Sequence, residues 1–538
     1  MVRRTVEAIL DKLNVAKATQ SYVLKEQCAE YTRVDIRKRI AAHLSKGDPR
    51  FVWLKGSPGQ GKTAIAMSLC QELERNNRLA ASFFFDKTRN NHSVDSTDHF
   101  VSALAYQLAN FDGRYRQSLI RRLRSNSDIL GGPLRVQLQT LIIEPMCEAY
   151  EGYRFEGPTC VIVLDGLDEC GEKSSLGDLM DVIIGREGIP GREGITGLRG
   201  LPNHFVIFAS SRPESEIRDA WERENTHLTE ILDDDDAKPD IRNYVIQHLT
   251  DHFQYDVTPP ETAPPQRDMR EFADRCGGLF LVAQIRVREV KKFLQIFLEP
   301  SIKTFRRILS DVPEVKEVDA EYLRIFRHAY LRKALQKDTK DRFRLVMSAV
   351  LDMMEPLSVH AISQLLDDDK SLVRAVLDPI CSVLDVPLTK DAPVRFYHAT
   401  TREFLQRPEF WKNHRKEKKM LFFPDVEGFL APHCLRVLRK NRLPQLHTHS
   451  NLEDVDTHFS SFRARFKDTM ANETCSHIRY AVFNFLYHAR GDARGLCTFS
   501  NEILPSWIIL RSLVARHLTA IHDLGMLIQV GCLTFMPL

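Results

Sequence analysis

Residues 56–63 of this 538-residue chain read G-S-P-G-Q-G-K-T and satisfy the spacing G-x-x-x-x-G-K-[ST]. Such a loop between a strand and a helix aims backbone N–H groups and a helix N-terminus at an anion. Lys62 would neutralise the β- and γ-phosphates of a nucleotide, and the Thr63 hydroxyl would hold Mg²⁺. The sequence therefore predicts a nucleotide site formed by Gly56, Ser57, Pro58, Gly59, Gln60, Gly61, Lys62 and Thr63.

A second run of residues could complete the metal and water chemistry of this site. The apolar stretch Cys160–Leu164 ends in Asp165, which is well placed to hold Mg²⁺, usually through water. Asp168 and Glu169 follow, and an acid just past a strand can polarise a water molecule against the γ-phosphate. The alternative is a solvated acidic loop, which is less favoured when the run follows a phosphate-binding loop in the correct order.

A third run, Phe205–Ala209, is also apolar and leads into Ser210, Ser211 and Arg212. In an open parallel sheet, ligands lie outside the carboxyl ends of the strands. Arg212 is therefore expected to approach the γ-phosphate and to sense its presence. The alternative is an arginine that caps a helix or lies on the surface.

The elements that must position these residues follow an alternating pattern. Short apolar runs alternate with helical patterns from about residue 47 to 215, which predicts a parallel sheet with helices on both sides. The predicted fold class is therefore an α/β P-loop NTPase core. Its strands are expected at Phe51–Leu54, Ala81–Phe85, Cys160–Asp165 and His204–Ser210.

Five regions are expected along the chain. A helical linker (1–46) precedes the α/β domain (47–215), and a helical lid (216–310), a winged-helix domain (311–408) and a C-terminal helical domain (409–538) follow. The winged helix is predicted from three helices and two short strands, with Ser358 as N-cap of His360–Leu366 and a further helix over Leu372–Leu384. A glycine-rich stretch that repeats G-R-E-G-I on either side of Pro190 predicts a flexible loop.

Bulk properties exclude several classes of protein. The chain has 75 basic and 72 acidic residues, so its net charge of +3 gives no strong field for nucleic acid or acidic lipid. Its longest uncharged apolar stretch, 524–538, has 15 residues, which falls short of the roughly 20 that a spanning helix needs. The 11 cysteines include no C-x-x-C pair, which favours reduced thiols. We expect a cytoplasmic protein that binds neither nucleic acid nor membrane.

Several motifs resemble one family. Gly56–Thr63, the D-G-L-D-E sequence at Asp165–Glu169 and the S-S-R-P sequence at Ser210–Pro213 look like the NACHT branch of the STAND signal-transduction ATPases. The resemblance is greatest to the fungal, NOD-like-receptor-type proteins that are called nephrocystin-like. Further matches are Cys28 with Thr32-Arg33, the helical-domain loop at Cys276–Leu281 without its usual proline, and the winged-helix signature at Phe396-Tyr397-His398 and Arg402–Leu405.

The resemblance implies a switch that uses ATP or ADP with Mg²⁺ and hydrolyses ATP slowly. Arg33 would belong to the nucleotide site, and His398 would contact the β-phosphate of ADP and hold the protein closed. Lys62, Asp168, Glu169 and Arg212 would form the catalytic set. Exchange of ADP for ATP would allow self-association, with effector or sensor proteins as partners in fungal immunity or incompatibility signalling.

Two other functions are alternatives on the sequence. A conventional P-loop ATPase or phosphotransferase shares the loop, but a kinase would need an acceptor pocket and an Arg-rich lid close after the core. A DNA-binding regulator could use the winged helix. Its candidate recognition helix, Ser371–Pro379, offers a single arginine, whereas phosphate contacts need several basic residues.

Overall fold

The computed structural model describes residues 10, 13, 27–86, 97, 99–125, 132–170, 173–186, 194–223, 227–232, 234–255, 264–297, 302–331, 337–441, 476–489 and 507. They divide into two compact units, residues 1–321 and residues 322–538. Residues 187–193 of the predicted glycine-rich loop, most of the predicted N-terminal linker and most of the C-terminal domain lie outside the described residues.

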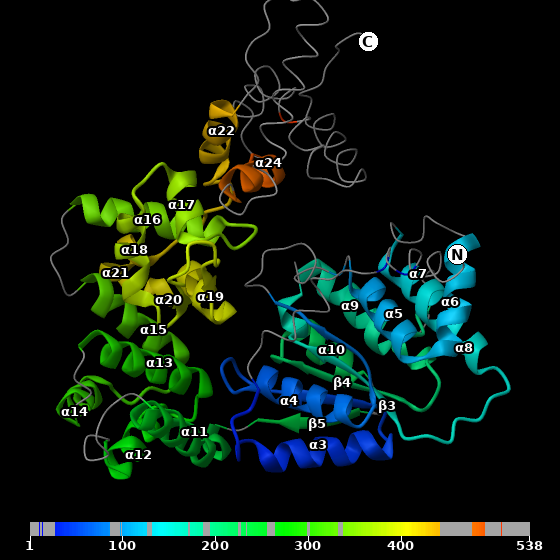
Figure 1. Cartoon of the computed structure of the whole chain (residues 1–538). Coiled ribbons are helices and arrows are strands. Elements are labelled where there is room, and N and C mark those ends of the chain that lie inside the picture. Colours follow the sequence, from blue (N-terminus) through cyan, green and yellow to red (C-terminus); the bar gives the residue numbers. More distant parts are fainter. Residues whose placement is uncertain are drawn as a thin grey trace, which may run out of the picture. The chain divides into compact units, whose positions relative to one another are not determined.

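A five-stranded parallel sheet forms the centre of the first unit, in the order β2-β3-β4-β1-β5 (Figure 1). Four strands match the expected runs to within two residues, and the fifth was not expected. The strands are β1 (Phe51–Lys55), β2 (Leu79–Phe84), β3 (Cys160–Asp165), β4 (Phe205–Ser211) and β5 (His227–Ile231). The unexpected β5 lies at the edge of the sheet and is only partly buried, so it lacks a continuous apolar run.

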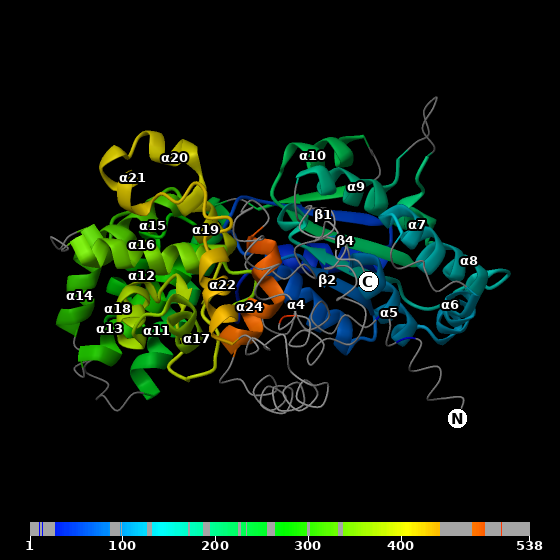
Figure 2. The ribbon, with the colours of Figure 1, turned by 90° about the horizontal axis from the view of Figure 1, so that it is seen from above.

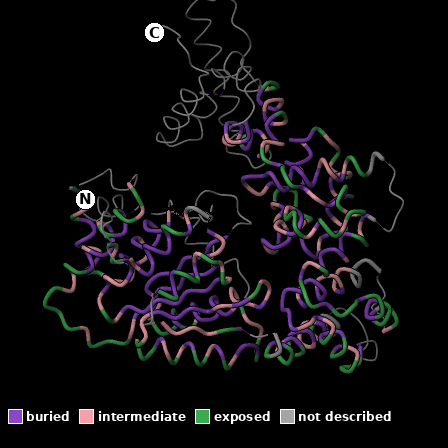
Figure 3. Tube along the Cα trace, turned by 180° about the vertical axis from the view of Figure 1, so that it is seen from behind, coloured by how far each residue is buried: buried purple, intermediate pink, exposed green. Residues whose placement is uncertain are grey.

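Alternate residues of each strand point to opposite faces, and both faces are covered by helices. Val52 and Leu54 pack with α3 (Val34–Lys46) and α4 (Lys62–Arg75), whereas Phe51 and Trp53 pack on the other face. That face carries α5 (Phe100–Phe111), α6 (Gly113–Ser125), α7 (Leu134–Leu138), α8 (Glu144–Tyr150), α9 (Lys173–Ile184) and α10 (Ser215–Glu222). The central strands are buried along their length, as Figure 3 shows. The predicted α/β P-loop NTPase core is confirmed.

Helices follow the last strand, β5, in the first unit. They are α11 (Asp234–Tyr255), α12 (Gln266–Asp274), α13 (Phe280–Phe297) and α14 (Ile302–Asp311), and α15 (Val318–Phe326) contains the boundary between the units. The sheet layer itself continues past residue 215, because Trp221 of α10 stacks on Trp53 at 5.7 Å between ring centroids and β5 follows.

Beyond α15 and a π-helical turn at Arg327–Leu331, the second unit continues with three helices, α16 (Lys337–Asp352), α17 (Val359–Leu366) and α18 (Lys370–Leu377). Ser358 caps α17 as expected, because its hydroxyl accepts the Ala361 N–H at 3.2 Å. The helix expected over 372–384 ends at Leu377 instead, because Pro379 has no N–H with which to continue the helical hydrogen bonds.

A two-stranded antiparallel hairpin, β6 (Leu384–Asp385) and β7 (Arg395–Phe396), follows these helices. The order of three helices and a hairpin is the one from which the sequence predicts a winged helix. The remaining helices are α19 (Ala399–Gln406), α20 (Pro408–Lys412), α21 (Arg415–Leu421), α22 (Ala431–Lys440) and α24 (Ser476–His488). The last two lie side by side, as Figures 1 and 2 both show. Across the described ranges, no helix combines the length and the hydropathy needed to cross a membrane.

Candidate phosphate-binding site

The phosphate loop, Gly56–Thr63, connects the end of β1 to the start of α4. Gly59 and Gly61 have φ values of +80° and +89°, which glycine adopts without the strain that a side chain would bring. These two residues let the chain turn tightly at the N-terminus of α4, where Lys62 and Thr63 are the first helical residues. The strand–loop–helix arrangement required for an anion site is therefore present.

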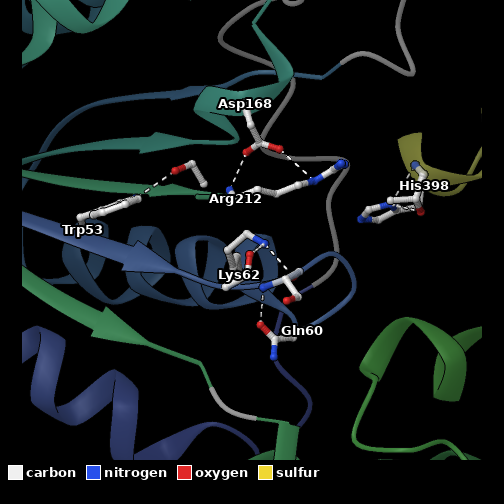
Figure 4. Close-up of polar contacts among 10 residues, drawn as sticks. Trp53, Gln60, Lys62, Asp168, Arg212 and His398 are labelled. Atoms are coloured by element: carbon white, nitrogen blue, oxygen red, sulfur yellow. Dashed lines mark hydrogen bonds and ion pairs between the residues drawn. The ribbon is translucent and has the colours of Figure 1, made fainter. Parts of the chain in front are cut away.

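Lys62 lies at the centre of the candidate site. Its ammonium group donates to the carbonyl oxygens of Gly56 at 2.7 Å and Ser57 at 2.9 Å (Figure 4). Burial lowers the pKa of Lys62 below its usual range, whereas the charge of the nearby Asp168 carboxylate acts in the opposite direction. Lys62 is therefore close to the acidic residues that the sequence placed in the same site.

Asp165 ends β3 and is 1% exposed. One carboxylate oxygen accepts a hydrogen bond from the hydroxyl of Ser210 on β4. Because β4 lies between β1 and β3, the carboxyl ends of all three strands meet at one edge of the sheet. Asp165 is thus on the edge that also carries the phosphate loop, where the sequence predicts a Mg²⁺ ligand.

Asp168 and Arg212, which the sequence treated as separate catalytic groups, contact each other directly. The Arg212 Nε lies 3.0 Å from Asp168 Oδ2, and the Arg212 backbone N–H donates to Asp168 Oδ1 at 2.9 Å (Figure 4). Both side chains are largely buried, at 5% and 17% exposed. Glu169 follows on the same 3-10 turn, Leu167–Glu169, and is partly buried.

Three consecutive residues at the end of β4 connect the parts of the site. Ser210 donates to Asp165, and Arg212 pairs with Asp168. Ser211 lies between them, and its hydroxyl accepts the indole N–H of Trp53 on β1 at 2.8 Å. The sequence alone assigns no role to either serine or to Trp53, although the polar S-S-R run at the end of an apolar strand is a signal for one.

Arg33 contacts the phosphate loop itself. It is 5% exposed and adopts a left-handed backbone conformation, with φ of 54°. Its guanidinium donates to the Gln60 carbonyl oxygen at 3.0 Å and lies 5.1 Å from the centre of the Phe280 ring. Its backbone N–H donates to Asp240 of α11 at 2.9 Å, a partner that the sequence did not indicate. Arg33 therefore links the phosphate loop to the helical region.

The Gln60 side chain connects the phosphate loop to the chain just after β5. Its Oε1 accepts the Ser57 N–H at 2.5 Å, and its Nε2 donates to the carbonyl oxygen of Leu232, just after β5, at 3.3 Å. The residue is 3% exposed. The amide thus satisfies two backbone groups that are far apart in the sequence.

Replacing Gln60 by alanine should therefore destabilise the loop by about 2 kcal/mol, since two backbone groups would lose their partner. Gln60→Glu keeps an acceptor for Ser57 but buries a carboxylate against the Leu232 carbonyl oxygen, and we expect at least as large a loss. Hydrogen exchange of the Ser57 amide in the full chain measures the effect. Exchange in Gln60→Ala that matches the unmodified protein would contradict this role.

The helical region reaches the phosphate loop at the start of α13. The Leu281 N–H donates to the Gly59 carbonyl oxygen at 3.0 Å, and a Cβ added at Gly59 would lie 2.8 Å from the Leu281 Cβ. Phe280 lies beside Gly61. The segment Cys276–Leu281, which the resemblance identifies as a helical-domain loop, therefore contacts the phosphate loop in the first unit.

His398 lies in the second unit, at the N-cap of α19. Its Nδ1 accepts the Thr400 N–H at 3.2 Å, so in the neutral ring the proton is on Nε2. The Thr400 hydroxyl lies 2.8 Å from this Nδ1 and 2.6 Å from the Tyr322 hydroxyl. Thr400 and Tyr322 fix the orientation of the imidazole, a role that the sequence did not predict for either.

Comparison with known proteins agrees with part of the sequence interpretation. Residues 37–192 match the family model described as nephrocystin 3, N-terminal, which supports the nephrocystin-like resemblance over less than a third of the chain. No curated protein matches the chain.

Solved structures similar to the chain include a RuvB mutant from Thermotoga maritima, with 12% identity and a TM-score of 0.31 over 71% of this chain and 98% of that one. Cdc6p from Pyrobaculum aerophilum has 11% identity and a TM-score of 0.34, covering 77% and 96%. Drosophila ORC bound to DNA has 11% identity and a TM-score of 0.30, covering 75% and 91%. Likenesses at this level carry no inference about activity. The first unit has a P-loop NTPase fold, and a large part of that fold resembles the nephrocystin 3 N-terminal family.

Proposed function

We propose that this chain is a nucleotide-dependent signalling switch of the NACHT type, which binds ATP or ADP and hydrolyses ATP slowly. The observation that carries the proposal is the hydrogen bond from Leu281 to Gly59, by which helix α13 begins on the phosphate loop itself. A movement of the phosphate loop on exchange of the nucleotide would therefore move the start of α13. A nucleotide shifts such an equilibrium only when it binds the two states with different affinity.

The predicted residues have distinct roles in this proposal. Lys62 would bind the β- and γ-phosphates, and Thr63 and Asp165 would hold Mg²⁺, which would neutralise charge that develops on the phosphates. Glu169 would orient the attacking water, and Arg212 would respond to the γ-phosphate. His398, with its proton on Nε2, has the donor that a β-phosphate oxygen would accept.

The same proposal gives the nucleotide a regulatory output. ADP would favour the closed form, and ATP would expose a surface for self-association with effector or sensor proteins as further partners. A contact of 1–3 kcal/mol that exists in one state only changes populations by about 5–150-fold, which is sufficient for such a switch. A cytoplasmic protein of fungal immunity or incompatibility signalling would use it in this way.

The proposal is tested by identifying the nucleotide that co-purifies with the full chain, by mass spectrometry, and by measuring ATP turnover. We expect bound ADP and turnover far below about 1 s⁻¹, the low end for ordinary enzymes. Lys62→Ala should remove the nucleotide, because the loop loses its only side-chain cation. Lys55→Ala, which removes the same charge at the end of β1, is the matched control and should retain it.

The alternative functions give different results in the same experiment. A nucleotide-free protein that hydrolyses ATP at about 10 s⁻¹ or faster would be a conventional ATPase, and the switch proposal would be wrong. A protein that binds neither ATP nor ADP would exclude both the switch and the conventional ATPase. Loss of nucleotide in the Lys55→Ala control would show that the effect of Lys62 is not specific to the loop.

A further inference from the structure

We propose that Asp168 sets the preference between di- and triphosphate nucleotides by competing with the terminal phosphate for Arg212. The inference rests on the proposed nucleotide site and adds a role that the sequence did not suggest. The sequence makes Asp168 a candidate catalytic group, whereas its contacts in the structure point to a positioning residue for Arg212.

The contacts of the pair support a positioning role. Both carboxylate oxygens of Asp168 accept from Arg212, one from the guanidinium at 3.0 Å and the other from the backbone N–H at 2.9 Å. Asp168 is 5% exposed, so solvent screens this interaction little. A carboxylate that is engaged in this way holds the arginine, and the role of orienting water is left to Glu169.

The turn that carries Asp168 keeps its carboxylate in place. Gly166 has a φ of 71°, the Glu169 N–H donates to the Gly166 carbonyl oxygen at 2.7 Å, and the Cys170 N–H donates to that of Leu167 at 3.2 Å. The turn follows β3, and Arg212 follows the neighbouring β4. The pair therefore bridges the exits of two adjacent strands, where the fold places ligands.

The chemistry of the guanidinium makes the carboxylate and a phosphate competitors. Arginine stays charged at all relevant pH values and binds either group through similar charge-assisted hydrogen bonds. A diphosphate has no γ-phosphate to draw Arg212 away, so the pair persists. The γ-phosphate of a triphosphate must share Arg212 with Asp168 or displace it from Asp168. The Asp168 carboxylate thus stabilises the arrangement in which a diphosphate is bound relative to the one in which Arg212 contacts the γ-phosphate.

The test compares dissociation constants of the full-length protein for ADP and for a slowly hydrolysed ATP analogue that carries a thio-γ-phosphate. Asp168→Asn keeps an oxygen for the Arg212 backbone N–H and removes the charge that holds its guanidinium. We expect the affinity for the analogue, relative to ADP, to rise by about tenfold. In an Arg212→Gln background, the same substitution should change that ratio less than about twofold.

The Arg212→Gln background separates the proposed competition from general electrostatics. Removing any nearby negative charge favours the more negative ligand, and that effect would persist without the arginine. Asp219→Asn, which removes an exposed carboxylate beside Arg218, is the matched control and should leave the ratio unchanged. A ratio that rises equally in both backgrounds would overturn the inference.

Other outcomes are equally decisive. If the unmodified protein binds both nucleotides but Asp168→Asn leaves their ratio unchanged, Asp168 has a structural role only. If the unmodified protein binds neither nucleotide, the proposed function itself is wrong. Should Asp168→Asn fail to fold, Asp168→Glu keeps the charge but displaces it from the Arg212 Nε. It should then raise the ratio in the same direction, and an unchanged ratio would overturn the inference.

Discussion

Replacing Glu321 by alanine is expected to destabilise the helical region around α13 by about 3–5 kcal/mol. Glu321 pairs with Arg286 at 2.7 Å, and both side chains are 0% exposed. Arg286 also donates to the carbonyl oxygens of Arg275 and Pro313, each at 2.8 Å. Without Glu321 the guanidinium charge would stay buried without its carboxylate, and water could not replace that partner.

The effect is measured by hydrogen exchange of the amides in 272–287 of the full chain, which reports local opening free energies. Asp268→Ala is the control, because it removes an ion pair whose Arg306 side chain is 59% exposed, and such pairs contribute about 0.2–1 kcal/mol. The double variant Arg286→Met with Glu321→Leu should be less destabilised than Glu321→Ala, since it leaves no buried charge. Equal exchange in Glu321→Ala and Asp268→Ala would contradict the prediction.

The central fold could be predicted because it is encoded in local patterns. Four strands are buried apolar runs, and the loop at Gly56–Thr63 fixes the strand before it and the helix after it. The edge strand β5 could not be predicted in this way. Its sequence, H-L-T-E-I, alternates little in polarity, and its strand conformation depends on pairing with β1. The end of α18 was predictable in principle from Pro379, because the lack of an N–H is a property of the residue itself.

Which residues belong to the site was easier to predict than which of them contact each other. Asp168 and Arg212 were each expected at the edge of the sheet, but their pairing requires β3 and β4 to be neighbours, which spacing does not specify. The link between Arg33 and Asp240 joins residues 207 positions apart. Such pairs depend on how the helical region packs against the sheet, and no local pattern reports that packing.

Replacing Gly277 by alanine is expected to lower the stability of the turn that leads into α13 by about 3 kcal/mol or more. This is the sum of the costs of backbone strain and of overpacking. Gly277 has a φ of +64°, and a Cβ at this position would lie 1.8 Å from the Val315 carbonyl oxygen. That contact involves backbone, so no side-chain rotation can relieve it. The turn must move, and Leu281 four residues later would lose its alignment with the Gly59 carbonyl oxygen. We therefore expect a lower unfolding midpoint together with faster release of bound nucleotide.

Gly177→Ala is the matched control for this prediction. Gly177 lies in α9, and a Cβ there would meet no atom within 4 Å. Alanine at such a helical position should be neutral or should stabilise the protein by about 0.5–1 kcal/mol. Thermal unfolding and nucleotide-release rates of both variants distinguish a specific effect of the turn from the general effect of a methyl group. If Gly277→Ala unfolds and releases nucleotide as Gly177→Ala does, the turn does not hold the helical region against the phosphate loop.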